Sequence, residues 1–153
     1  MGTSGNTVRD LASRWESDVI ALKPHWLSVM IGINDVWRQF DGRDDASIVL
    51  PEEFQNTYDR LITRTRPLLA GLVLMSPYYV PSLETDAMRR RMDEYTAIVR
   101  KLAAKHGAVF VDVQAVIDAA LTSTGYASIA ADRVHPTPEG HRILARAFLG
   151  AVA

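Results

Sequence analysis

An aspartate and a histidine stand three residues apart in the segment 132–136, which reads Asp-Arg-Val-His-Pro. A general base needs an imidazole that a carboxylate holds in one tautomer, and Asp132 in a turn can reach the far ring nitrogen of His135. Pro136 then fixes the direction of the chain after the histidine. The same spacing also suits a surface turn in which Asp132 caps the next helix. This motif alone leaves both interpretations open.

Two other polar segments carry groups that could stabilise a developing negative charge. Segment 32–35 (Gly-Ile-Asn-Asp) follows an apolar run, and the amide of Asn34 could donate to an oxyanion. The alternative is an Asx-turn that only satisfies the loop backbone. Segment 4–7 (Ser-Gly-Asn-Thr) contains Gly5, which could bring its N–H close to a ligand or simply adopt a positive φ.

Helical and strand patterns alternate along the chain, and these elements must position the polar segments. Apolar residues at helical spacing predict helices over 7–22, 51–69, 88–102 (ending near Gly107), 114–121 and 143–151. Thr7 with Asp10 resembles a capping box, and Pro51 suits a first helical turn. Apolar runs predict buried parallel strands over 26–31, 72–75 and 109–111.

This alternation predicts one α/β domain over residues 1–153, with a parallel sheet and helices on both faces. In open α/β sheets, ligands bind outside the carboxyl ends of the strands. The three polar segments occupy that position in the predicted order of elements. We therefore expect Gly5, Asn34 and His135 to converge on one point.

Composition excludes several classes of function. The 153 residues carry a formal net charge of −1 without a basic stripe, which argues against a nucleic-acid partner. The absence of cysteine excludes disulfides and thiolate chemistry. Apolar runs are too short to span a membrane. No cofactor or metal is indicated, because His135 and His141 do not share a helix face. The location is undetermined, and it is cytoplasmic if the chain start is natural, since no signal peptide opens the chain.

The three segments together resemble, in the right order, the second, third and fifth sequence blocks of the SGNH/GDSL-type serine esterase and lipase family. The resemblance covers essentially the whole chain. It implies a flavodoxin-like three-layer α/β/α sandwich and ester hydrolysis through an acyl-enzyme. Carried over by position, His135 is the general base and Asp132 orients it, while Gly5 and Asn34 form two parts of the oxyanion hole. The implied substrates are small acyl esters, with acetylated carbohydrate as one candidate; thioesters and lysophospholipids also occur in the family.

The sequence departs from this family in lacking its first block, Gly-Asp-Ser. We expect that block and the first two strands to lie before residue 1, so that the chain is truncated and has very low activity alone. Ser4 is the one serine near the expected oxyanion glycine, but it is better suited to the turn or to capping the helix. The alternative is a catalytically inactive binding or assembly module that forms a homo-oligomer through its exposed sheet edge.

Several other residues follow the predicted strands at the same end of the sheet. Trp37 and Arg38 are candidates for a substrate pocket, with Arg38 meeting a polar leaving group, although Trp37 could equally pack under the loop. Tyr78 lies at the same edge and has the same two interpretations. Asp112 is a second candidate for the acid that orients His135, and a helix N-cap is its alternative role.

Overall fold

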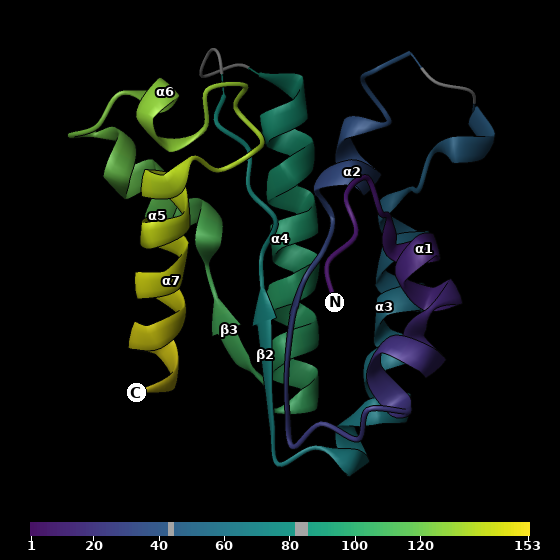
Figure 1. Cartoon of the computed structure of the whole chain (residues 1–153). Coiled ribbons are helices and arrows are strands. Elements are labelled where there is room, and N and C mark those ends of the chain that lie inside the picture. The colour runs from purple at the N-terminus through teal and green to yellow at the C-terminus, as the bar shows by residue number, and fades with distance from the viewer. Residues whose placement is uncertain (43–44, 82–85) are drawn as a thin grey trace.

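A three-stranded parallel sheet forms the centre of the computed structural model, which describes residues 1–42, 45–81 and 86–153 (Figure 1). The strands are β1 (Trp26–Met30), β2 (Gly71–Met75) and β3 (Val109–Val111), in that order across the sheet. Val73 of β2 lies opposite Ser28 on one side and Val109 on the other. All three predicted strands are confirmed, and their carboxyl ends meet at one edge of the sheet.

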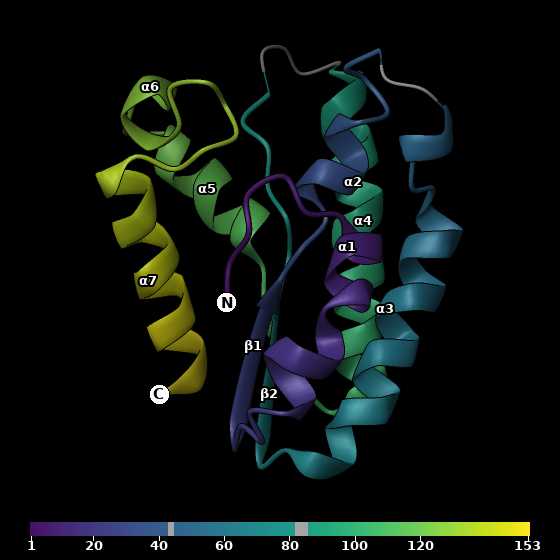
Figure 2. The same cartoon turned by 45° about the vertical axis from the view of Figure 1, so that its right-hand side comes forward.

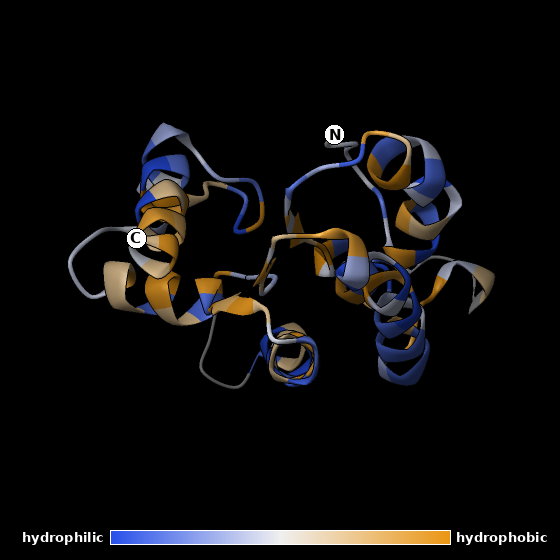
Figure 3. Cartoon of the chain, turned by 90° about the horizontal axis from the view of Figure 1, so that it is seen from below, coloured by the Kyte–Doolittle hydropathy of each residue, from blue (hydrophilic) through white to orange (hydrophobic). Residues whose placement is uncertain are grey.

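Helices cover both faces of the sheet, as predicted. Figure 2 shows α1 (Val8–Ser13), α3 (Pro51–Thr65) and α4 (Ala87–His106) on one side and α7 (Pro138–Val152) on the other, and Figure 3 shows the same layers end-on. Helices α5 (Val113–Leu121) and α6 (Tyr126–Ile129) lie with α7. Leu74 of β2 belongs to one buried apolar cluster and Val73 to another, because successive strand residues point to opposite faces. The fold is the expected three-layer α/β/α sandwich.

The first predicted helix is wrong as one continuous element over 7–22. Its start is correct, since the capping box of Thr7 and Asp10 is formed, but α1 ends at Ser13. A π-helical turn, η1 (Glu16–Ile20), follows. The indole N–H of the buried Trp15 donates to the Thr65 hydroxyl at 2.7 Å, so a long-range contact competes with regular helix geometry. A π turn holds one extra residue, which lets the chain keep Trp15 in the core.

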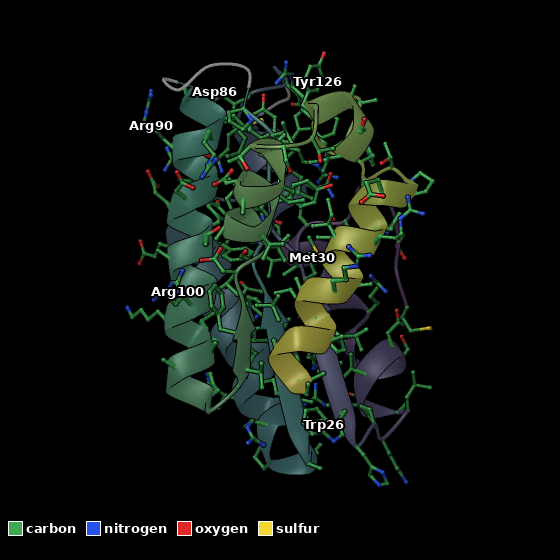
Figure 4. The ribbon with its side chains drawn as sticks, turned by 90° about the vertical axis from the view of Figure 1, so that its left-hand side faces the viewer. Trp26, Met30, Asp86, Arg90, Arg100 and Tyr126 are labelled. Carbon is green, nitrogen blue, oxygen red and sulfur yellow. The ribbon has the colours of Figure 1, made fainter. Side chains whose placement is uncertain are left out.

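The prediction that β1 is buried on both faces is also wrong. Trp26 is 59% exposed and Met30 is 39% exposed (Figure 4). The reason is the position of β1 at the edge of the sheet, whereas α7 packs against β3. Within the described ranges, β1 has a strand partner on its β2 side alone.

A short helix, α2 (Ile33–Trp37), follows β1 where the sequence indicated a loop. It begins after Gly32, whose φ of 127° is in the region that favours glycine. A Cβ there would also lie 3.0 Å from the ring of Pro77. The described residues also form 3₁₀ turns at Asp45–Ser47 and Arg66–Leu68, and the four-residue helix α6. Of these elements, α2 bears on function because it carries Asn34.

Candidate active site

The three polar segments lie at the carboxyl edge of the sheet. Segment 4–7 precedes α1, α2 follows β1, and residues 130–137 lead into α7, all toward the upper end of the sheet in Figure 1. Gly5, Asn34 and His135 line one cavity of about 430 Å³ and also a second one of about 270 Å³. The structure thus brings together the three residues that the sequence analysis expected to converge.

Asp132 and His135 form a hydrogen-bonded pair at this edge. One carboxylate oxygen of Asp132 lies 2.7 Å from Nδ1 of His135. The other accepts the backbone N–H groups of Val134 at 3.1 Å and of His135 at 2.8 Å. The hydrogen bonds from His135 lower the pKa of Asp132 to about 2, so this carboxylate is ionised at neutral pH. Nε2 of His135 has no hydrogen-bond partner among the described residues and is available to a ligand.

The turn that carries this pair is fastened to the segment after β2. Arg133, at a φ of 72°, donates to the carbonyl of Pro81 at 2.6 Å and accepts the N–H of Val80 at 3.0 Å. Its guanidinium lies 4.3 Å from the centre of the Tyr126 ring. Thr137 then caps α7. These contacts fix the backbone of the turn and leave the side chains of Asp132 and His135 more than half exposed.

The opposite side of the cavities is formed by Gly5 and α2. Gly5 has a φ of 78°, a conformation that glycine adopts without strain. One N–H of the Asn34 amide donates to the carbonyl of Asn6 at 3.0 Å, and an amide group has a second N–H to offer. The N–H of Gly5 and that second N–H of Asn34 are two donors of the kind that stabilise an oxyanion.

Asp35, next to Asn34, is fully buried. One carboxylate oxygen accepts the backbone N–H of Val8 at 2.9 Å, and the other has no partner among the described residues. Burial raises the pKa of Asp35 to about 7, partly opposed by the hydrogen bond from Val8. The sequence motif singled out Asn34 and gave no sign that the carboxyl group of its neighbour would be buried.

Trp37 and Arg38 line the smaller, more polar cavity together with Asp41. The Trp37 ring meets the His135 ring edge-on, with 6.1 Å between centroids. The guanidinium of Arg38 donates to the carbonyl of Gly5 at 2.6 Å. Arg38 therefore both lines a cavity and contacts the protein backbone, and its contact with a leaving group stays a prediction.

Apolar side chains form most of the larger cavity, and several of them were not predicted as site residues. Its walls include Met30, Ile31, Ile33, Val134, His141 and Leu144. Tyr78 also lines it, and burial together with the charge of Asp132 raises the pKa of its hydroxyl to about 12. The sequence could have indicated His141 and Leu144 as site residues, because they lie in the first turns of α7, directly after the turn that carries His135.

Ser4 was the alternative candidate for the nucleophile, and Asp112 was the alternative candidate for the acid that orients His135. Ser4 lines both cavities, but within the described ranges no hydrogen bond joins it to His135. Asp112 caps α5 by accepting the N–H of Ala115 at 3.1 Å and pairs with Arg100. It lines neither cavity, so the carboxylate that contacts His135 is that of Asp132.

The histidine, aspartate and glutamate side chains of the described residues form no group of three or more that could hold a metal ion. No helix among the described residues has the length and apolarity needed to cross a membrane.

Comparison with known proteins gives matches over almost the whole chain. The sequence pattern of the GDSL-like lipase/acylhydrolase family matches residues 1–143. An acetylxylan esterase of Geobacillus stearothermophilus is 50% identical over 150 residues, which cover 97% of this chain and 68% of that protein. Among solved structures, the acetylxylan esterase from the same organism has a TM-score of 0.94 at 49% identity, covering 98% of this chain and 69% of that one.

A second solved structure is an α/β hydrolase from the metagenome of Lake Arreo, Spain. It has a TM-score of 0.95 at 49% identity and covers 99% of this chain and 70% of that one. Other structures of the Geobacillus enzyme are described as catalytic mutants, in which a serine, an aspartate or a histidine is replaced by alanine. That aspartate and histidine are three positions apart. This chain belongs to the GDSL-like lipase/acylhydrolase family and is by that membership an esterase-type enzyme.

Proposed function

We propose that this site hydrolyses acetyl esters of carbohydrate by a Ser-His-Asp mechanism, with a nucleophilic serine that is not among these 153 residues. The observation that carries the proposal is the common location of Gly5, Asn34 and His135 around two adjoining cavities, with Asp132 hydrogen-bonded to the far nitrogen of the imidazole. A base and two oxyanion donors facing the same space are what acyl transfer requires.

The proposed reaction has two halves. The serine hydroxyl attacks the ester carbonyl while Nε2 of His135 takes its proton, and the ionised Asp132 stabilises the imidazolium. The N–H groups of Gly5 and Asn34 hold the negative oxygen of the tetrahedral intermediate. The intermediate collapses to an acetyl-enzyme and an alcohol that receives the proton from His135. Water, deprotonated by His135, then releases acetate and restores the serine.

Both the relatives and the smaller cavity support a carbohydrate ester as the substrate. The Geobacillus relative at 50% identity is an acetylxylan esterase. The smaller cavity combines the Trp37 ring with Asp41 and the backbone around Gly5, and such a mixture of an aromatic face and polar groups suits a sugar hydroxyl surface. We assign the sugar portion to this cavity.

The position of the serine in the Geobacillus enzyme supports a nucleophile outside these residues. The serine replaced in its catalytic mutant lies near the start of that protein, further ahead of its aspartate than the length of chain that precedes Asp132 here. Ser4, the nearest serine to the oxyanion donors, makes no hydrogen bond to His135 within the described ranges.

The test compares this chain with a form extended at its N-terminus by the N-terminal segment of the Geobacillus esterase, which includes the serine replaced in its catalytic mutant. We expect the extended form to hydrolyse p-nitrophenyl acetate and acetylated xylo-oligosaccharides, and the unextended chain to retain about 10³–10⁴-fold over water at most. The control is the same extension with alanine in place of the serine. Equal activity of the serine and alanine forms would refute the proposal.

The outer edge of β1 has no strand partner among the described residues, which leaves a binding or assembly module as a second candidate function, although the esterase relatives do not favour it. Trp26 and Met30 are exposed there, and an uncovered edge is a surface on which another strand can pair. Sedimentation analysis of this chain tests it. Association that depends on concentration and is lost in Trp26→Lys would support assembly through this edge, whereas a stable monomer would exclude it.

A further inference from the structure

The segment that carries Gly5 has little packing of its own. Residues 1–5 are exposed, and a Cβ placed on Gly5 would have no atom within 4 Å. The φ of 78° at Gly5 is one of many conformations open to glycine. Apolar burial therefore does not fix the direction of its N–H, and hydrogen bonds to the neighbouring peptide groups must do so.

Two side chains of α2, together with that of Arg38 at the C-terminal end of this helix, provide those hydrogen bonds. Asn34 donates to the carbonyl of Asn6, Asp35 accepts the N–H of Val8, and Arg38 donates to the carbonyl of Gly5. The distances are 3.0, 2.9 and 2.6 Å, respectively. Helix α2 thus holds the backbone from residue 5 to residue 8 at three points, and the contact nearest to the N–H of Gly5 is that of Arg38.

The surroundings of Arg38 fix its guanidinium in this position. Its side chain is 22% exposed, and Nη1 lies 4.0 Å from the carboxylate of Asp10. Asp10 is itself held, because it accepts hydrogen bonds from the N–H and the hydroxyl of Thr7, both at 2.8 Å. The guanidinium therefore lies between the Gly5 carbonyl and a carboxylate that is fixed at the start of α1. A planar donor with several N–H groups suits this double contact.

We propose that Arg38 is a positioning residue for the oxyanion hole: by holding the Gly5 carbonyl against α2, it keeps the N–H of Gly5 aligned with the amide of Asn34. In this role Arg38 acts through the peptide group of Gly5 and not by contact with the reacting atoms. The inference rests on the proposed function in so far as Gly5 donates to the oxyanion. It adds a second role to the sequence-based prediction that Arg38 meets the leaving group.

The first test follows the Gly5 amide directly in this chain. In ¹⁵N-labelled protein, the heteronuclear NOE of Gly5 reports whether its N–H is held on the picosecond-to-nanosecond timescale. We expect the NOE to fall in Arg38→Ala and to recover in part in Arg38→Lys, which keeps one donor. A merely structural role of Arg38 would lower the unfolding midpoint without changing Gly5 in the folded protein.

Arg9 offers a matched control. It too donates to two backbone carbonyls, those of Ala46 and Ile48, and pairs with Glu53, but it lines neither cavity. Arg9→Ala should leave the NOE of Gly5 unchanged. If Gly5 is as well ordered in Arg38→Ala as in the wild type, or is loosened equally by Arg9→Ala, the proposal is overturned.

The second test uses the serine-bearing extended form. An oxyanion contact acts mainly in the transition state, so Arg38→Ala should lower kcat about 10- to 100-fold, less than the loss of a donor itself, with KM for p-nitrophenyl acetate within about twofold. An increase in KM for acetylated xylo-oligosaccharides with kcat unchanged would assign Arg38 to sugar binding instead. If the extended form has no esterase activity at all, the proposed function fails. The heteronuclear NOE of Gly5 still tests separately whether Arg38 positions its amide.

Discussion

The two halves of the site are built in different ways. The acid–base half is an exposed turn, in which the side chains of Asp132 and His135 are 55% and 63% exposed. The oxyanion half rests on α2, where Asp35 is fully buried and three side chains hold the backbone of residues 5–8. Changes in the exposed half should therefore affect catalysis alone, whereas changes in the buried half should affect both catalysis and folding stability.

The largest effect should come from His135→Ala, which isolates the exposed half. In the serine-bearing form we expect kcat/KM to fall about 10⁴-fold or more, because the proton acceptor is lost. The unfolding midpoint should stay within about 2 °C, since the imidazole is exposed and buries little surface. His141→Ala is the matched control, because His141 lines the larger cavity without contacting Asp132. A large drop in the unfolding midpoint of His135→Ala would show that the exposed half also contributes to folding stability.

The buried carboxyl group of Asp35 should make the free energy of unfolding depend on pH. The pKa of Asp35 is about 7 in the folded protein against 3.8 as its ordinary value. Between these values the unfolded chain loses this proton while the folded protein keeps it, so stability falls as pH rises from about 4 to 7. The full difference corresponds to roughly 4 kcal/mol at most. The charges that act on Asp35 are those of Arg38, which lowers its pKa, and Asp10, which raises it.

Chemical denaturation at several pH values measures this effect in the wild type and in Asp35→Asn, which retains an acceptor for Val8. The difference between the two proteins removes the contribution of the histidines. We expect the wild type to lose stability relative to the variant as pH rises through this range. Parallel pH curves would show that Asp35 is not a buried titrating group.

Asn34→Ala should change both properties in one variant. Loss of one oxyanion donor lowers kcat about 10²–10³-fold. Loss of the hydrogen bond to the Asn6 carbonyl should also cost about 1 kcal/mol of unfolding free energy. Steady-state kinetics and denaturation of the same preparation check the two effects together. A variant with normal stability and normal kcat would remove Asn34 from the oxyanion hole.

The smallest effect is expected for Arg133→Ala, which loosens the exposed turn without removing a reacting group. Arg133 donates to the carbonyl of Pro81 and lies over Tyr126. We expect kcat to fall about 3- to 10-fold as the imidazole becomes less well placed. Arg142→Ala serves as the control, because Arg142 contacts Glu139 on the surface of α7. An effect equal to that of His135→Ala would show that the turn depends on this one side chain.

Much of the framework was predictable from the sequence because it depends on local patterns. Alternating apolar periodicity predicted the three strands and the main helices, and the Thr7–Asp10 spacing predicted the start of α1. The order of the three polar segments predicted their convergence, since parallel strands end at the same edge. Asp132 and His135 are near neighbours in the chain, so their contact needed no long-range information.

The remaining features depend on contacts between distant residues. Helix α2 has five residues, too few for a periodic apolar signal. The break after Ser13 accompanies a hydrogen bond from Trp15 to Thr65, fifty positions away. The burial of Asp35 and the direction of Arg38 depend on how segment 5–8 crosses α2, which no local pattern encodes. The oxyanion half was therefore harder to predict than the acid–base half.

The most direct test of the central claim is a crystal structure of the serine-bearing form after reaction with a small alkyl phosphonate ester. The tetrahedral adduct imitates the intermediate of ester hydrolysis. We predict that its phosphoryl oxygen lies about 2.7–3.1 Å from both the N of Gly5 and Nδ2 of Asn34, with Nε2 of His135 facing the serine oxygen. An adduct whose oxygen points away from Gly5 and Asn34, or whose serine lies out of reach of His135, would contradict the account.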